Sequence, residues 1–301
     1  MRTTRWLSAT LAASSMFVAA GVMGAELEVN GTTLQLESSG EGPVVLFVHG
    51  AISDHRVWVP YREAIGADHR FVAYDQRYFG TSPWTDDGKH FSIDTHVDDL
   101  VGLIEALDAG PVHMVTWSYG GEVGVYAARK RPELFRSVVH FEPAVEALHP
   151  GLPGQPAALS QLYDTFGPAM DALDRDAYAE ASRRFIEAVF RLPTGAADAF
   201  PESYRTMWDD NARTLPLFLE LARPPLDCAD LATADTPTLV VQGAEAHVLD
   251  AMMADQVVRC QPQTVSLTMP GVNHDGPYRA PDRLADIVLS FVSLFESDVA
   301  R

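Results

Sequence analysis

The sequence has 301 residues, and 47% of them are hydrophobic, so the chain can bury a large core. That length fits one large α/β domain with an inserted piece as well as two separate domains. The 22 basic and 41 acidic residues give a formal net charge of −19, and a surface so acidic repels nucleic acid and anionic lipid. There is no internal repeat, no His-Glu-x-x-His motif and no Cys/His cluster with metal spacing, so the sequence predicts no metal ion and no cofactor.

The N-terminal residues have the composition of an export signal. Arg2 and Arg5 precede an uncharged, mostly apolar run over residues 6–23, and small residues stand where a signal peptidase could cut. The run is short for a membrane span and is interrupted by serine and threonine. We therefore predict a signal peptide over residues 1–25 and a bacterial protein that is periplasmic or secreted, without stable membrane association after cleavage. An uncleaved membrane anchor is the alternative.

Apolar runs bounded by turn residues predict the strands of the chain. Asn30-Gly31 separates two alternating segments within residues 27–36, which is typical of a β-hairpin. The run at residues 43–48 is continuously apolar, as expected for a parallel strand that is covered on both faces. The predicted strands cover residues 43–48, 71–74, 112–115, 137–141, 238–242 and 265–269, and the predicted core helices cover 95–107, 251–259 and 281–295.

The pattern changes between residues 144 and 225. Strand signals vanish there, prolines recur, and the remainder is typical of amphipathic helices. The order of elements predicts a doubly wound, mostly parallel α/β sheet with an inserted helical lid, in which residues 26–143 and 226–301 form the core and 144–225 the lid. Export would permit a disulfide between Cys228 and Cys260, and the sequence leaves that bond as open as two free buried thiols.

The stretch from His113 to Gly121, HMVTWSYGG, predicts a strand that turns abruptly into a helix around Ser118. Such a turn strains the serine backbone and requires small residues two positions before and after it, here Thr116 and Gly120. The turn exposes the hydroxyl and directs the unpaired N–H groups of the new helix toward it. The motif therefore predicts a nucleophile, while a chance serine in a turn is the other interpretation.

Four motifs fall where the carboxyl ends of the parallel strands would meet. They are HGA at 49–51, DQRYFGTS, WSYGG around Ser118 and PGVNHDGPYRAP around His274. In order and spacing they resemble the α/β-hydrolase superfamily over nearly the whole mature chain. The resemblance implies the α/β-hydrolase fold and a pairing of Ser118 with His274. Thr116 and Tyr78 depart from the family pattern, because glycine is common at both positions.

The resemblance also implies a third catalytic group, usually an aspartate in the loop that here contains Ala246. Our choice for this carboxylate is Glu142, one residue beyond the preceding strand, and in this placing the chain is similar to zearalenone lactonases. Pro143 restricts Glu142 to extended or turn geometry. The alternatives are Glu245, in a Gly-Ala loop that offers nothing rigid to hold it, and Asp250.

These residues predict an acyl-enzyme mechanism. His274 takes the proton of Ser118 as the serine attacks a carbonyl carbon, and the backbone N–H groups of Ala51 and Tyr119 form the oxyanion hole. A serine excludes the epoxide hydrolases and haloalkane dehalogenases of this fold, which need an aspartate nucleophile. We predict a monomeric or weakly associating carboxylic ester hydrolase, an esterase or lactonase with a small-molecule substrate. An amide hydrolase and a ligand-binding receptor without turnover are the alternatives.

Aromatic residues predict the character of the substrate. Trp117 at the strand-to-helix turn is predicted to contact it, and the aromatic side chains of the lid favour an apolar acyl or aromatic group. The same lid side chains could instead pack the lid onto the core. They are Phe166, Phe185, Phe190, Tyr204, Trp208 and Phe218.

Overall fold

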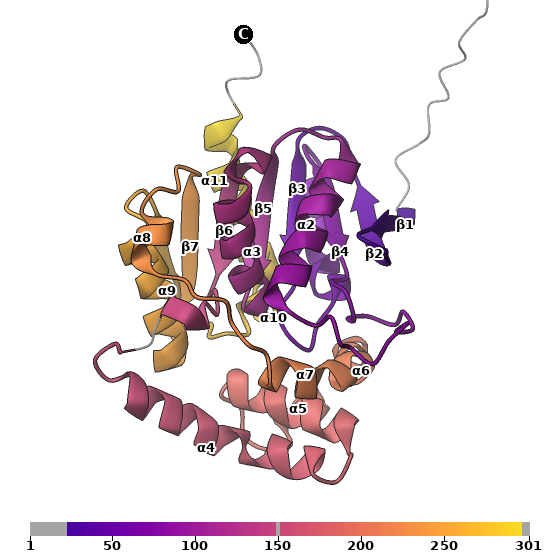
Figure 1. The fold of residues 1–301 in the computed structure, drawn as a ribbon, viewed down its shortest axis with the longest axis vertical. Helices are drawn as coiled ribbons and strands as arrows, with labels where there is room; N and C mark the ends of the chain where they lie inside the picture. Colours follow the sequence, from indigo (N-terminus) through magenta and orange to yellow (C-terminus); the bar gives the residue numbers. More distant parts are fainter. Residues whose placement is uncertain (1–22, 149–150, 297–301) are drawn as a thin grey trace, which may run out of the picture.

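The computed structural model describes residues 23–148 and 151–296, which form one eight-stranded sheet with helices on both faces (Figure 1). The strand order is β1-β2-β4-β3-β5-β6-β7-β8. β2 pairs antiparallel with β1 and β4, and all the other pairs are parallel. The predicted doubly wound, mostly parallel sheet is confirmed. Its strands are β1 Met23–Val29, β2 Thr32–Ser39, β3 Val44–Val48, β4 Arg70–Tyr74, β5 Val112–Trp117, β6 Phe135–Phe141, β7 Thr238–Gly243 and β8 Val265–Met269.

Local sequence explains why these strands form. Asn30 and Gly31 adopt φ values of 48° and 74° between β1 and β2, and a two-residue turn with both φ values positive matches the twist of a hairpin. Every residue of β3 is buried, as its continuous apolar composition predicted, and every residue of β5 is buried too, His113 and Thr116 included. The site therefore rests on central strands that water does not reach.

Helices cover both faces of the sheet. In Figure 1, α2 and α3 cross in front of the strands and α11 lies behind them. Ser92 caps α2 by accepting a hydrogen bond from the Thr95 N–H, and Asp108 ends it in the left-handed conformation. No helix in the described part of the chain is long and apolar enough to cross a bilayer. The core helices are α1 Arg62–Gly66, α2 Ile93–Leu107, α3 Tyr119–Lys130, α8 Cys228–Leu231, α9 Val248–Cys260, α10 Gly276–Arg279 and α11 Pro281–Val292, with 3₁₀ helices η1 His55–Tyr61, η2 Pro132–Leu134 and η6 Ser293–Phe295.

Most of the segment between β6 and β7 forms a layer of helices at one end of the molecule, at the bottom of Figure 1, whereas α8 lies beside β7. This layer lies beyond the carboxyl ends of the strands, where it can cover a site. Within it α4 packs on α5 and also contacts α9 of the core. Its elements are α4 Gln155–Leu173, α5 Tyr178–Val189, α6 Glu202–Asn211 and α7 Leu215–Leu219, with η3 Glu146–Leu148, η4 Ala196–Ala199 and η5 Ala212–Thr214.

The structure decides the state of the two cysteines, which the sequence left open. Cys228 and Cys260 form a disulfide with a Cα–Cα distance of 4.6 Å, which ties the start of α8 to the end of α9. The predicted signal peptide lies outside the described residues except for residues 23–25, which belong to β1.

Candidate active site

Ser118 lies between β5 and α3 with φ 54° and ψ −122°, a conformation that L-residues rarely adopt. The strain is held by hydrogen bonds, because the Ser118 N–H donates to the Phe141 carbonyl at 3.2 Å. Close packing behind the turn explains Gly120, since a Cβ there would lie 2.4 Å from the His49 carbonyl oxygen. The turn therefore has the geometry that the small-residue spacing predicted.

Thr116 takes the place of a family glycine, and the structure shows what its side chain does. The residue is fully buried at the end of β5, and its Oγ1 lies 2.6 Å from Nδ1 of His140 in β6. Burial lowers the pKa of His140 to about 3, so this imidazole is neutral and serves as a hydrogen-bond partner. The threonine thereby ties β5, which leads into Ser118, to β6, which leads into Glu142.

His274 and Glu142 meet beside this turn although 132 residues separate them. His274 Nδ1 lies 2.8 Å from Glu142 Oε2, and Glu142 Oε1 accepts a hydrogen bond from the Gly243 N–H at 2.7 Å. Glu142 is 1% exposed and has φ 42°, so before Pro143 it adopts a turn conformation rather than an extended one. With both carboxylate oxygens bonded, the side chain is held rigidly against the imidazole.

The two alternative acids lie in different places. Glu245 is exposed, and within the described residues its carboxylate forms no hydrogen bond or ion pair with His274. Our reason for setting it aside was wrong, because its loop is held by backbone hydrogen bonds from Ala244 to Met269 and from Glu245 to Val272. Asp250 is closer, with Oδ2 3.9 Å from His274 Nδ1, in the first turn of α9.

Charges around His274 favour its protonated form. Burial alone would lower its pKa, but the carboxylates of Asp250 and Glu142 outweigh that effect and raise the pKa above its ordinary value. Burial and the nearby Glu142 in turn raise the pKa of Asp250 to about 6, although His274 acts in the opposite direction. The site can therefore stabilise an imidazolium ion, which a base that removes a serine proton becomes.

A cavity of about 140 Å³ opens onto Ser118 and His274, and Ala51, Trp117 and Asp250 also line it. No hydrogen bond joins the Ser118 hydroxyl to His274 within the described residues, and such bonds are often long until substrate binds. A larger cleft of about 350 Å³ lies between the β1–β2 hairpin and the loop after β4, and it contains neither catalytic candidate. The smaller cavity is therefore the one that contains the candidate catalytic residues.

The lid aromatics divide into two groups. Phe166, Phe185 and Phe218 line the cavity, as Trp117 does. Phe190, Tyr204 and Trp208 instead pack on Tyr278 of the core, where the Trp208 indole N–H donates to the Tyr278 hydroxyl at 3.1 Å. Three of the six lid aromatics are therefore placed to contact a substrate, and the other three pack the lid onto the core.

Ala51 follows β3, and Tyr119 is the first residue of α3, directly after Ser118. Within the described residues neither of their backbone N–H groups donates to a backbone or side-chain acceptor, while the neighbouring Gly121 and Glu122 amides bond to the Ser118 carbonyl. Unpaired amides at a helix N-terminus can hold a developing oxyanion. The two predicted donors are thus available.

The sequence analysis did not predict the charged side chains of Arg223 and Glu146 in the wall of the cavity. Arg223 and Glu146 both line it, and Arg223 also contacts Glu122 of α3. The one available signal was Glu122 itself, an acid among the apolar residues of a core helix.

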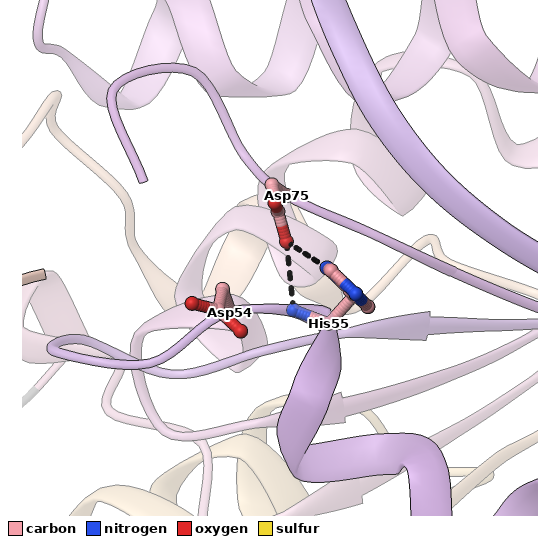
Figure 2. A group of neighbouring side chains, drawn as sticks. All are labelled: Asp54, His55 and Asp75. Carbon is pink, nitrogen blue, oxygen red and sulfur yellow. Dashed lines mark hydrogen bonds and ion pairs between the residues drawn. The ribbon is translucent and has the colours of Figure 1, made fainter. Parts of the chain in front are cut away.

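A second cluster of titratable side chains braces the loop after β3 (Figure 2). His55 uses its backbone N–H and its Nδ1 to bond Asp75 Oδ1, at 2.8 and 2.6 Å, which links η1 to the end of β4. Asp54 binds Arg56 and Asn211 instead. This cluster and the Glu142, Asp250 and His274 group each bring three atoms of metal-ligand type within 4.8 Å of one another, and most of those atoms already have protein partners.

The chain matches the family model described as alpha/beta hydrolase fold over residues 43–276. It is 26% identical over 280 residues to 2-(acetamidomethylene)succinate hydrolase of Mesorhizobium japonicum, which covers 88% of this chain and 94% of the relative. It is 31% identical over 122 residues to an epoxide hydrolase of Caballeronia sordidicola, covering 40% of this chain and 37% of that protein. A solved thermophilic esterase from Thermogutta terrifontis has the same fold, with a TM-score of 0.66, 22% identity and coverage of 91% of this chain and 99% of that one.

Proposed function

Because this chain belongs to the alpha/beta hydrolase fold family, we propose that it is a serine hydrolase that cleaves carboxylic esters or lactones through an acyl-enzyme intermediate. Ser118 is the nucleophile, His274 the base and Glu142 the acid of its triad. The observation that carries the proposal is the buried hydrogen bond of 2.8 Å between His274 and Glu142, at a cavity that Ser118 lines. The same arrangement supports the proposed similarity to zearalenone lactonases in the position of the acid.

The proposed ester cleavage uses Ser118, His274 and Glu142 in turn. The Ser118 oxygen attacks the carbonyl carbon while His274 Nε2 takes the hydroxyl proton, and Glu142 stabilises the imidazolium through Nδ1. The negative oxygen that forms is held by the N–H groups of Ala51 and Tyr119. His274 then returns the proton to the departing alcohol oxygen, and a water molecule deprotonated by the same imidazole releases the acid.

The cavity limits the acyl group. Its volume of about 140 Å³ is close to the roughly 150 Å³ of an engineered apolar cavity that holds benzene in another protein. Short acyl chains, small lactones or a single ring therefore fit within this volume. Trp117, whose indole N–H donates to the His274 carbonyl at 3.1 Å, contributes one wall.

The test is steady-state hydrolysis of short esters, lactones and matched amides by the purified protein and by Ser118→Ala. We expect ester or lactone turnover that Ser118→Ala abolishes. Stoichiometric binding of a ligand without turnover would instead indicate a receptor, and turnover that survives in Ser118→Ala would exclude the serine mechanism.

We also propose that the protein is exported and is monomeric or weakly associating. The basic and apolar N-terminal residues support cleavage near residue 25. N-terminal sequencing of protein from the periplasm or medium checks this, and intact Met1 on cytosolic protein would contradict it.

A further inference from the structure

The cavity that contains Ser118 has an ionic network at one side. Arg223 carries the one guanidinium or ammonium group among the described residues that line it. All three guanidinium nitrogens face protein oxygens: Nη2 lies 2.8 Å from Glu146, Nε 3.4 Å from Glu122, and Nη1 2.9 Å from the Leu221 carbonyl. The guanidinium also stands 5.5 Å from the ring centre of Phe218, another lining residue. The cation is therefore held in the wall and has few donors left for a substrate.

Glu122 is the unusual member of this network. It lies in α3 four residues after Ser118, is fully buried, and its Oε1 has no partner within the described residues. Burial raises its pKa to about 8, despite the opposing effect of Arg223. Burial also raises the pKa of Glu146, whose carboxylate lies closer to Arg223, and Arg223 again acts in the opposite direction. Either glutamate can therefore supply the counter-charge of Arg223, so both must be replaced to free the guanidinium.

The rest of the lining adds no second guanidinium or ammonium group among the described residues, and its other cationic group is the imidazole of His274 beside Asp250. Asp250 is the other acid of the cavity wall, and no guanidinium or ammonium group of the described lining faces it. The remaining surface is mostly apolar, so a carboxylate placed there would lose its hydration without gaining a cationic partner. The apolar lining includes Leu159, Leu162, Phe166, Phe185, Ile186 and Phe218.

We propose that Glu122 and Glu146 determine the charge selectivity of the cavity: by holding the guanidinium of Arg223 between them, they make the site accept uncharged acyl groups and reject acyl groups that end in a carboxylate. This inference rests on the proposed ester hydrolysis and names the substrate class within it. Neither glutamate takes part in bond making, so both act as specificity-determining residues.

The test compares two substrates of the same shape and opposite polarity. Ethyl 4-methylpentanoate ends its acyl chain in an isopropyl group, and monoethyl succinate ends it in a carboxylate. With ethanol release as the readout, kcat/KM of the wild type should be about 100-fold higher for the uncharged ester. The double variant Glu122→Gln, Glu146→Gln frees Arg223 and should narrow that ratio at least about tenfold, because a charged hydrogen bond to the succinate becomes possible.

Matched variants separate charge selectivity from damage to the fold. Glu202→Gln, Glu220→Gln removes two exposed acids of the lid and should leave the ratio unchanged. Glu146→Asp keeps the negative charge and should retain the preference of the wild type, and thermal melting checks that each variant is folded. Equal rates on the two esters in the wild type, or an unchanged ratio in the folded double variant, would overturn the inference.

Failure of the proposed function has a different signature. If neither ester is hydrolysed, binding of 4-methylpentanamide and succinamate is measured directly by calorimetry. Selective binding of the uncharged amide that the double variant loses would uphold charge selectivity in a protein that is not an esterase. Equal binding of both amides would refute it.

Discussion

The two sides of the cavity are built by different means. On the core side, Ser118 and Glu142 follow directly from strands, and backbone hydrogen bonds hold them in left-handed or strained conformations. On the lid side, Phe166 and Phe185 stack with ring centres 5.2 Å apart and depend on side-chain packing. Backbone-held groups keep their geometry when neighbouring side chains change, whereas packed rings do not. Under the proposed function, the core therefore determines the chemistry and the lid determines which acyl group fits.

The lid is fastened to the core by a few polar contacts around the rim. Asn273, next to His274, donates to the Phe190 carbonyl at 2.7 Å, and Asn211 donates to Asp54 at 2.7 Å. Arg191 donates to the Glu245 carbonyl at 3.1 Å. These contacts place the aromatic lining over Ser118 without contributing to the triad.

The largest effect is expected on the core side, at the acid of the triad. Glu142→Gln keeps the shape of the side chain but cannot stabilise imidazolium, so kcat should fall by about 10⁴-fold, as in the aspartate-to-asparagine change of a serine protease. Circular dichroism should show an unchanged fold. Glu245→Gln is the control and should remain near the wild type, because that side chain is exposed and does not contact His274. The reverse pattern would assign the acid to the later loop.

A smaller effect is expected at Asp250, which lies between the two sides. Asp250 raises the pKa of His274, and the base is active only when neutral, so activity is lost as pH falls through this raised pKa. Asp250→Asn removes that charge and should move the acidic limb of kcat/KM to lower pH. It should also lower kcat about tenfold, which corresponds to one pKa unit of lost imidazolium stabilisation.

The matched control is Asp255→Asn, an exposed acid on the same helix. This variant should change neither the acidic limb of the kcat/KM profile nor kcat. An acidic limb that stays in place in Asp250→Asn would show that Glu142 alone sets the pKa of His274.

The difference between core and lid also explains what the sequence could predict. Strand ends meet at one rim of a parallel sheet, so the order of the strands placed Ser118, Glu142 and His274 at one rim, and the family resemblance then indicated their roles. The role of Thr116 could not, because its bond to His140 depends on the register of β5 and β6. Tyr78, in the left-handed region with φ 74°, is similarly held by a bond from Trp84 to its carbonyl that no local rule predicts.

The side-chain contacts of the lid could not be predicted from the sequence, because they also depend on how the elements pack. Six aromatic residues look alike along amphipathic helices, and only the packing angle of each helix decides which rings face the cavity and which face Tyr278. Arg223 follows the last lid helix in an irregular segment, so nothing periodic indicated that it returns to Glu122 in the core.

On the lid side a modest change of specificity is expected. Phe185 is 5% exposed and lines the cavity, so Phe185→Leu enlarges the space for the acyl chain. The ratio of kcat/KM for hexanoate over butanoate esters should rise about threefold, in keeping with the value of a methylene group in an apolar pocket. Phe200→Leu, in which the ring packs on Trp208 away from the cavity, is the control. A general loss of activity on both esters would mean that the ring orders the lid instead.

The smallest effect on activity is expected at the disulfide, which lies in the core but away from the strand ends. Replacing Cys228 with Ser and Cys260 with Ala opens a loop with a sequence separation of 32 residues, which should cost about 3 kcal/mol of stability and lower Tm by about 5–10 °C. Turnover at 25 °C should nevertheless stay the same.

Asp250 lies at the opposite end of α9 from Cys260, roughly 15 Å along the helix, and the intervening turns are held by Met253 and Val257 in the core. Thermal melting and kcat/KM measured on one preparation test both statements, and a fall in kcat at unchanged Tm would mean that the bond positions Asp250 rather than stabilising the fold.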